Sequence, residues 1–156
     1  MATILVVDDE PHIREMITAS LEIAGHEVVS AEDGEHALRK LKRRRYDLVL
    51  LDIMMPKMDG YEVLDQLRRM PSREGTRVIV LTAKHDPEGV AREIEAGAAD
   101  HLAKPFLPSE LEAAIERVLD DGPHVGDERR RILSSDAEMY GSMQGLVESA
   151  RTSNDA

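Results

Sequence analysis

The chain has no cysteine, and this absence excludes both a disulfide framework and a thiolate metal centre. Long apolar runs are also lacking: the longest, residues 48–55, is interrupted by Asp52 and is far shorter than the roughly 20 residues of a transmembrane helix. The N-terminus has no basic segment followed by an apolar one, the pattern of a secretory signal. We therefore expect a cytoplasmic protein without a membrane segment.

Basic residues are outnumbered by acidic ones, 20 to 31, and the formal net charge is -11. Nucleic-acid-binding modules usually carry a basic patch that neutralises phosphates. The basic cluster at residues 40–45 ends a helical pattern that we expect to stop near Arg45, where the helix dipole favours lysine and arginine. We therefore expect no direct contact with nucleic acid.

Apolar runs alternate with helical patterns along most of the chain. The expected strands are residues 3–7, 27–31, 48–52, 77–81 and 100–103. Two of the helical stripes are Ile13, Met16, Ile17, Leu21 and Ala24, and Leu111, Ala114, Ile115, Val118 and Leu119. Five such units predict an α/β fold in which helices cover both faces of a doubly wound parallel sheet.

Polar residues end or directly follow four of these strands: Asp8 and Asp9, Asp52, Thr82, and Lys104. Parallel strands bring such groups to one edge of the sheet, where ligands bind in open α/β folds. Gathered carboxylates repel one another, and a hard cation such as Mg²⁺ relieves that repulsion. A cation, a lysine and a hydroxyl together form a clamp for a phosphoryl group, and a neighbouring carboxylate can accept that group.

Each of these residues also has a structural interpretation. An aspartate after a strand commonly forms a turn or caps a helix, as Asp9 would before Pro11. Thr82 can simply end a strand, and Lys104 can be a solvated loop residue. Taken singly, these interpretations are favoured; taken as a set at the ends of adjacent strands, the residues favour a functional site.

Several segments of the chain resemble the bacterial response-regulator receiver domain. They are ILVVDDE at residues 4–10, AEDG at 31–34, LLDIMMP at 50–56 with DG at 59–60, VLTA at 80–83, GAAD at 97–100 and AKPF at 103–106. The resemblance covers residues 1–121, with the motifs in family order. It implies a flavodoxin-like fold, a five-stranded sheet in the order 2-1-3-4-5 with five helices.

The resemblance also implies a function: a phosphorylation-activated switch of a two-component phosphorelay. Asp52 would accept a phosphoryl group from a sensor histidine kinase or a phosphotransfer protein. The metal would be Mg²⁺ or Mn²⁺, bound by Asp9, Asp52 and the backbone carbonyl of Met54, with Asp8 acting through water. Such a protein is a phosphoacceptor rather than an enzyme, although it assists its own phosphorylation and dephosphorylation.

Further roles follow from the same resemblance. Thr82, the backbone N–H of Ala83, and Lys104 would bind the phosphoryl oxygens, and the Lys104–Pro105 bond would be cis. Thr82 would also take part in the switch. The family usually has tyrosine or phenylalanine where this chain has His101, so we expect either a pH-sensitive switch at this position or a surface imidazole without a switching role.

Residues 122–156 form a linker and a C-terminal extension that is too short for a core of its own. We therefore expect output through a protein partner or a homodimer, using the fourth helix, fifth strand and fifth helix. The extension would pack on that face, join the dimer or stay disordered. Its apolar stripe favours docking: Ala137, Tyr140, Met143, Val147 and Ala150.

Two other function classes compete with the signalling interpretation. A phosphohydrolase acting through an aspartyl phosphate needs an acid/base carboxylate two residues after the nucleophile, and that residue here is Met54. A scaffold that never takes phosphate would be recognised by loss of the acidic, hydroxyl or lysine groups, and this chain has them all.

Overall fold

The computed structural model describes residues 1–70, 75–83 and 87–120. Within these residues the chain alternates five strands with five helices: β1 (Thr3–Val7), α1 (Pro11–Ile23), β2 (Glu27–Ala31), α2 (Gly34–Arg43), β3 (Leu48–Asp52), α3 (Gly60–Arg68), β4 (Arg77–Thr82), α4 (Pro87–Glu95), β5 (Asp100–Ala103) and α5 (Pro108–Asp120). The apolar stripe expected in the extension lies outside the described residues. None of the described helices is both long and apolar enough to cross a membrane.

The strands form one parallel sheet in the order β2-β1-β3-β4-β5, as predicted. In the register, Val7 pairs with Leu51, and Asp52 pairs with Leu81. Thr82 in turn pairs with Ala103, one residue before Lys104. The residues that follow β1, β3, β4 and β5 therefore meet along one edge of the sheet.

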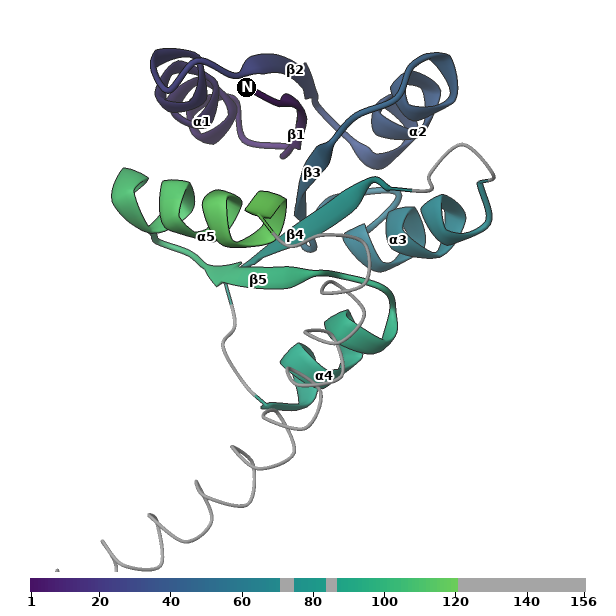
Figure 1. Cartoon of the computed structure of the whole chain (residues 1–156). Helices are drawn as coiled ribbons and strands as arrows, with labels where there is room; N and C mark the ends of the chain where they lie inside the picture. The colour runs from purple at the N-terminus through teal and green to yellow at the C-terminus, as the bar shows by residue number, and fades with distance from the viewer. Residues whose placement is uncertain (71–74, 84–86, 121–156) are drawn as a thin grey trace, which may run out of the picture.

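Helices cover both faces of the sheet, with α1 and α5 on one side and α2 and α3 on the other (Figure 1). Alternate residues of each central strand enter different cores. Leu50, for example, packs in the core beneath α1 and α5, whereas Leu51 packs in the core beneath α2 and α3. Burial on both faces explains why β3 is a continuous apolar run.

Turn and capping residues set where several helices begin and end. The side chain of Asp33 accepts a hydrogen bond of 2.8 Å from the backbone N–H of His36 at the start of α2, and Asp59 accepts one of 3.0 Å from Glu62 at the start of α3. Gly25, with a φ of 94°, takes the left-handed conformation that follows α1.

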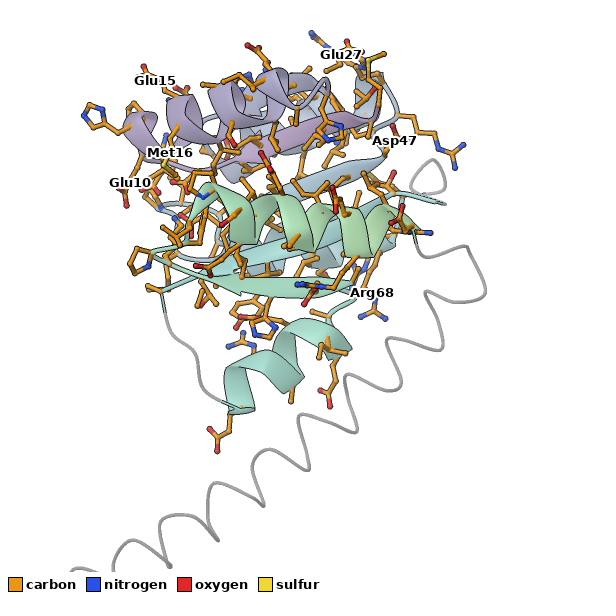
Figure 2. The ribbon with its side chains drawn as sticks, turned by 60° about the vertical axis from the view of Figure 1, so that its left-hand side comes forward. Glu10, Glu15, Met16, Glu27, Asp47 and Arg68 are labelled. Atoms are coloured by element: carbon orange, nitrogen blue, oxygen red, sulfur yellow. The ribbon has the colours of Figure 1, made fainter. Side chains whose placement is uncertain are left out.

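The stripe predicted on α1 is only partly correct. Ile17 and Leu21 are buried, but Met16 and Ala24 are exposed. Figure 2 labels Met16 beside Glu15 on this helix. The predicted stripe is wider than the face that meets the sheet and α5, so its margins reach solvent.

The edge strand β5 carries an inward-facing acid. Asp100 is only 6% exposed, and its carboxylate accepts a hydrogen bond of 2.8 Å from the backbone N–H of His101. The guanidinium of Arg117, on α5, lies 3.4 Å from the other oxygen. This ion pair compensates a charge that would otherwise be costly to bury.

Candidate functional site

Three charged side chains meet at the carboxyl edge of the sheet. The Lys104 ammonium lies 2.7 Å from one Asp8 carboxylate oxygen and 3.4 Å from an oxygen of Asp52. Asp8 is fully buried, and Asp52 is 3% exposed. The structure thus brings together residues from three strand ends that are separated by up to 96 positions in the sequence.

The loop after β3 fixes the position of Asp52. The Asp52 carboxylate accepts a hydrogen bond of 3.1 Å from the backbone N–H of Met54. The N–H of Gly60 donates to the Ile53 carbonyl at 2.9 Å, which draws the start of α3 against the end of β3. A Cβ at residue 60 would lie 2.6 Å from the Asp52 carbonyl oxygen, so only glycine fits this approach.

Burial and charge make Asp52 unusually basic for a carboxylate. Desolvation, followed by repulsion from Asp8 and contact with Asp9, raises the pKa of Asp52 from 3.8 to about 6. Lys104 and the Met54 N–H oppose this rise in the pKa of Asp52. Burial also acts to lower the pKa of Lys104, but the hydrogen bond to Asp8 and the charge of Asp52 outweigh it and raise that pKa.

A second group of acids lies beside this centre. Carboxylate oxygens of Asp8, Asp9 and Glu10 all lie within 4.8 Å of one another, a donor set that suits a hard cation. Two of these residues were predicted as metal ligands, and Glu10 was not. Glu10 is exposed and lies at the end of the molecule opposite Glu27 and Asp47 (Figure 2).

Asp52 does not belong to that group of three, although it contacts Asp9 and shares Lys104 with Asp8. The donor chemistry therefore fits the predicted Mg²⁺ or Mn²⁺, because oxygen ligands are grouped and the buried Asp52 carboxylate has a charge that a cation would compensate.

The sequence analysis did not identify Arg14, whose guanidinium donates a hydrogen bond of 2.6 Å to the backbone carbonyl of Asp8.

The remaining predicted residues lie on β4, β5 and the loops that follow them. Thr82 is buried at the end of β4, and its carbonyl accepts a hydrogen bond of 2.8 Å from the backbone N–H of Lys104. Ala83 follows Thr82 and is exposed. His101 is half-buried on β5, two residues before the position that pairs with Thr82. The Lys104–Pro105 peptide is cis.

The arrangement suits transfer of a dianionic group. A carboxylate, an ammonium and a hydroxyl from different strands come to one sheet edge, and acids suited to a cation lie beside them. An ammonium group and a bound cation stabilise the oxygens of a phosphoryl group, and the carboxylate of Asp52 is available as the acceptor of that group.

Proteins of similar sequence are transcriptional regulators by name. The chain is 47% identical over 116 residues to the probable transcriptional regulator ycf27 of Porphyridium aerugineum, a match that covers 74% of this chain and 47% of that protein. It is 41% identical to the alkaline phosphatase synthesis transcriptional regulatory protein PhoP of Bacillus subtilis, covering 74% of this chain and 48% of that protein. The chain spans about half the length of these curated relatives.

Because these relatives are named as transcriptional regulators, the expectation of no direct nucleic-acid contact has no support from the comparison. The acidic composition describes only this chain, whereas the relatives are about twice as long as the matched part. That expectation is therefore withdrawn.

Solved structures and a family model agree with the sequence comparison. The chemotaxis protein CheY4 of Vibrio cholerae is 38% identical and superposes with a TM-score of 0.74, covering 76% of this chain and 99% of that one. A putative response regulator from Chloroflexus aurantiacus is 36% identical, with a TM-score of 0.72 and coverage of 76% and 98%. The model of the response regulator receiver domain matches residues 4–116. This chain therefore belongs to the family of response regulator receiver domains.

Proposed function

We propose that Asp52 is the phosphoacceptor of a two-component signalling switch. The observation that carries this proposal is the buried centre in which Asp52 and Asp8 share the ammonium of Lys104. A carboxylate oxygen of Asp52 attacks the phosphorus of a phosphohistidine on a sensor kinase or phosphotransfer protein. The P–N bond breaks, and its electron pair remains on the imidazole nitrogen, which takes a proton.

The metal is Mg²⁺ or Mn²⁺. Asp9, Asp52 and the backbone carbonyl of Met54 would hold it, and Asp8 would act through water. When bound, the cation neutralises charge that develops on the phosphoryl oxygens. The close grouping of Asp8 and Asp9 supports this assignment, and Glu10 adds a third carboxylate near the same place.

Thr82, the backbone N–H of Ala83, and Lys104 contact the phosphoryl group in this proposal. Burial of the Thr82 side chain at the carboxyl edge, beside Lys104, supports the assignment. Before transfer, Lys104 holds the Asp8 and Asp52 carboxylates together. After transfer it would pair with a phosphoryl oxygen, so the ion pairs of the centre change with phosphorylation.

In the phosphorylated state, the surface formed by α4, β5 and α5 would bind a downstream protein or a second copy of the chain. In this proposal residues 1–121 form the receiver domain and residues 122–156 a linker and extension. A cytoplasmic location, where sensor kinases present their phosphohistidines, fits this function. The partner that donates the phosphoryl group in this proposal is a sensor kinase or a phosphotransfer protein.

The test is incubation with acetyl phosphate and Mg²⁺, followed by intact mass measurement. We expect a gain of one phosphoryl group in the wild type and none in Asp52→Asn. Asp65→Asn is the matched control, because Asp65 is an exposed residue of α3 and pairs only with Arg69 among the described ion pairs. A gain that persists in Asp52→Asn would remove Asp52 from its role.

His101 is proposed as the second switch residue, coupled to Thr82. Its ring nitrogen Nδ1 lies 3.9 Å from the Asp100 carboxylate, so a charged ring would have an acidic neighbour. We expect the NMR signals of the His101 ring to shift on phosphorylation, by different amounts at pH 6 and pH 8. A ring that is unchanged at both pH values would show that His101 has no switching role.

A further inference from the structure

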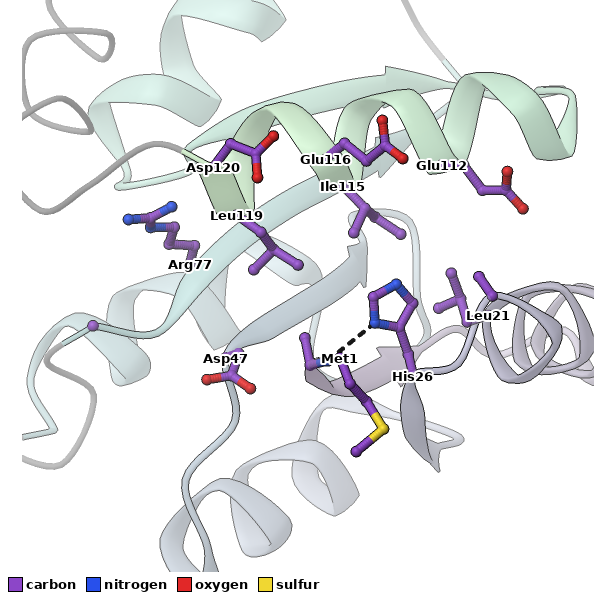
Figure 3. Close-up of a pocket in the computed structure, with 13 residues that line it drawn as sticks. Met1, Leu21, His26, Asp47, Arg77, Glu112, Ile115, Glu116, Leu119 and Asp120 are labelled. Carbon is purple, nitrogen blue, oxygen red and sulfur yellow. Dashed lines mark hydrogen bonds between the residues drawn. The ribbon is translucent and has the colours of Figure 1, made fainter.

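A groove of about 570 Å³ lies between α1 and α5, at the amino ends of the strands. It is thus at the opposite edge of the sheet from Asp52. Its apolar lining includes Leu21 of α1 and Ile115 and Leu119 of α5 (Figure 3). The groove is lined by no residue of the acidic centre and, from β4 and β5, by Arg77 at the amino end of β4, so the proposed phosphotransfer does not account for it.

Carboxylates line the α5 side of this groove. Glu112, Glu116 and Asp120 are spaced four residues apart on the helix, and all three are exposed (Figure 3). None of the three forms an ion pair with any residue in the described part of the chain. Asp47 contributes a fourth carboxylate from the loop before β3, and accepts a hydrogen bond of 2.8 Å from the Thr3 N–H.

The stability of α5 does not explain this row of acids. Like charges four residues apart destabilise a helix, and an acid in the last turn opposes the helix dipole. Two basic groups of the groove already have hydrogen-bond partners within the protein. Arg77 donates a hydrogen bond to the Val118 carbonyl, and His26 Nδ1 accepts one of 3.1 Å from the Ala2 N–H. The groove therefore suits a ligand that has positive charge beside apolar groups.

The sequence just after α5 has this chemistry. Residues 129–133 read RRRIL, three consecutive arginines followed by two large apolar residues. Arg129 lies nine positions after Asp120, and a chain of this length can span about 30 Å when extended. The 13-residue α5 is about 20 Å long, so residues 129–133 can reach any part of the groove. A connection this short also gives the segment a high effective concentration there.

We propose that the groove between α1 and α5 binds residues 129–133 of the same chain. The arginines pair with the carboxylates of α5, and the apolar residues pack against Ala24 and Leu119, which keep accessible apolar surface in the lining. Each arginine can make a bidentate contact with a carboxylate, which lysine could not reproduce. The contact anchors the C-terminal extension beside α5, one of the elements of the proposed output surface.

Disulfide cross-linking tests the proposal without background, because the natural chain has no cysteine. The test pair is Glu116→Cys with Arg130→Cys. The matched control pair is Ala113→Cys with Arg130→Cys, since Ala113 is also exposed on α5 but does not line the groove. Under mild oxidant we expect the test pair to close into a cross-linked monomer roughly tenfold faster than the control.

Charge reversal distinguishes specific pairing from proximity. Arg129→Glu with Arg131→Glu should slow the test pair to the rate of the control, and adding Glu112→Arg with Asp120→Arg should restore it. Raising the salt concentration should also slow cross-linking of the test pair.

Equal rates for the test and control pairs, or no restoration by the second reversal, would overturn the proposal. Cross-linked dimers in place of monomers would assign the groove to a second copy of the chain and would also overturn it. Each variant is phosphorylated with acetyl phosphate in parallel. A normal mass gain shows that the receiver domain is folded, and it keeps this test separate from the role of Asp52.

Discussion

Removing the charge of Asp52 should stabilise the protein at neutral pH when no metal is present. Burial, with repulsion from Asp8, raises the pKa of this carboxyl from 3.8 to about 6. A rise of about two pKa units corresponds to about 3 kcal/mol between the two protonation states. The folded protein therefore pays up to about 3 kcal/mol to ionise Asp52, and Asp52→Asn avoids this cost.

The sign of the pH dependence follows from the direction of the shift. The folded state binds the Asp52 proton more tightly than the unfolded state, so the contribution of this group to stability is fully present below pH 3.8. It is lost as the pH rises through about 6. We expect the advantage of Asp52→Asn over wild type to grow between pH 4 and pH 8, on top of any constant effect of the buried amide.

Urea denaturation in EDTA, at intervals from pH 4 to pH 8, measures this difference. Glu15→Gln is the control, because an exposed carboxylate on α1 should change stability by less than about 0.5 kcal/mol at each pH. Adding Mg²⁺ should narrow the gap, since a cation bound only to the folded wild type stabilises it. A gap that is independent of pH, or that shrinks as pH rises, would refute the reasoning.

Three further substitutions probe how the centre is held, each followed by urea denaturation at pH 8 without metal. Lys104→Met leaves Asp8 with an uncompensated buried charge and should cost about 3 to 5 kcal/mol; a loss below 1 kcal/mol would show that the ion pair matters little. Gly60→Ala should cost more than about 1 kcal/mol, because its Cβ would meet backbone atoms at 2.6 and 2.7 Å, and an unchanged midpoint would contradict this close approach. Asp59→Ala removes the cap of α3 and should cost about 1 kcal/mol, with Asp65→Ala on the same helix as its control.

The strands were predictable because their sequence signal is local, whereas their order was implied by the resemblance to the receiver domain. A strand buried on two faces reads as a continuous apolar run, as β3 does, and parallel strands then carry their terminal polar residues to one edge. The meeting of Asp8, Asp52 and Lys104 follows from that topology alone. Roles in phosphotransfer stay predictions.

What could not be predicted depends on contacts between distant segments. The second helix was expected to end near Arg45, but α2 ends at Arg43. Arg44 instead turns extended, with a φ of -150°, and its guanidinium lies 3.1 Å from the carboxylate of Glu27 at the start of β2. The grouping of Glu10 with Asp8 and Asp9 depends likewise on the turn after β1.

The inward acid of β5 also bears on solubility. An outermost strand leaves unpaired backbone N–H and C=O groups, to which another chain can add by extending the sheet. A strand of four residues with a charge pointing into the protein is a poor template for such addition. Loss of Arg117 would remove one charged partner of Asp100 and loosen this edge, so variants there would be expected to aggregate before they lose the acidic centre.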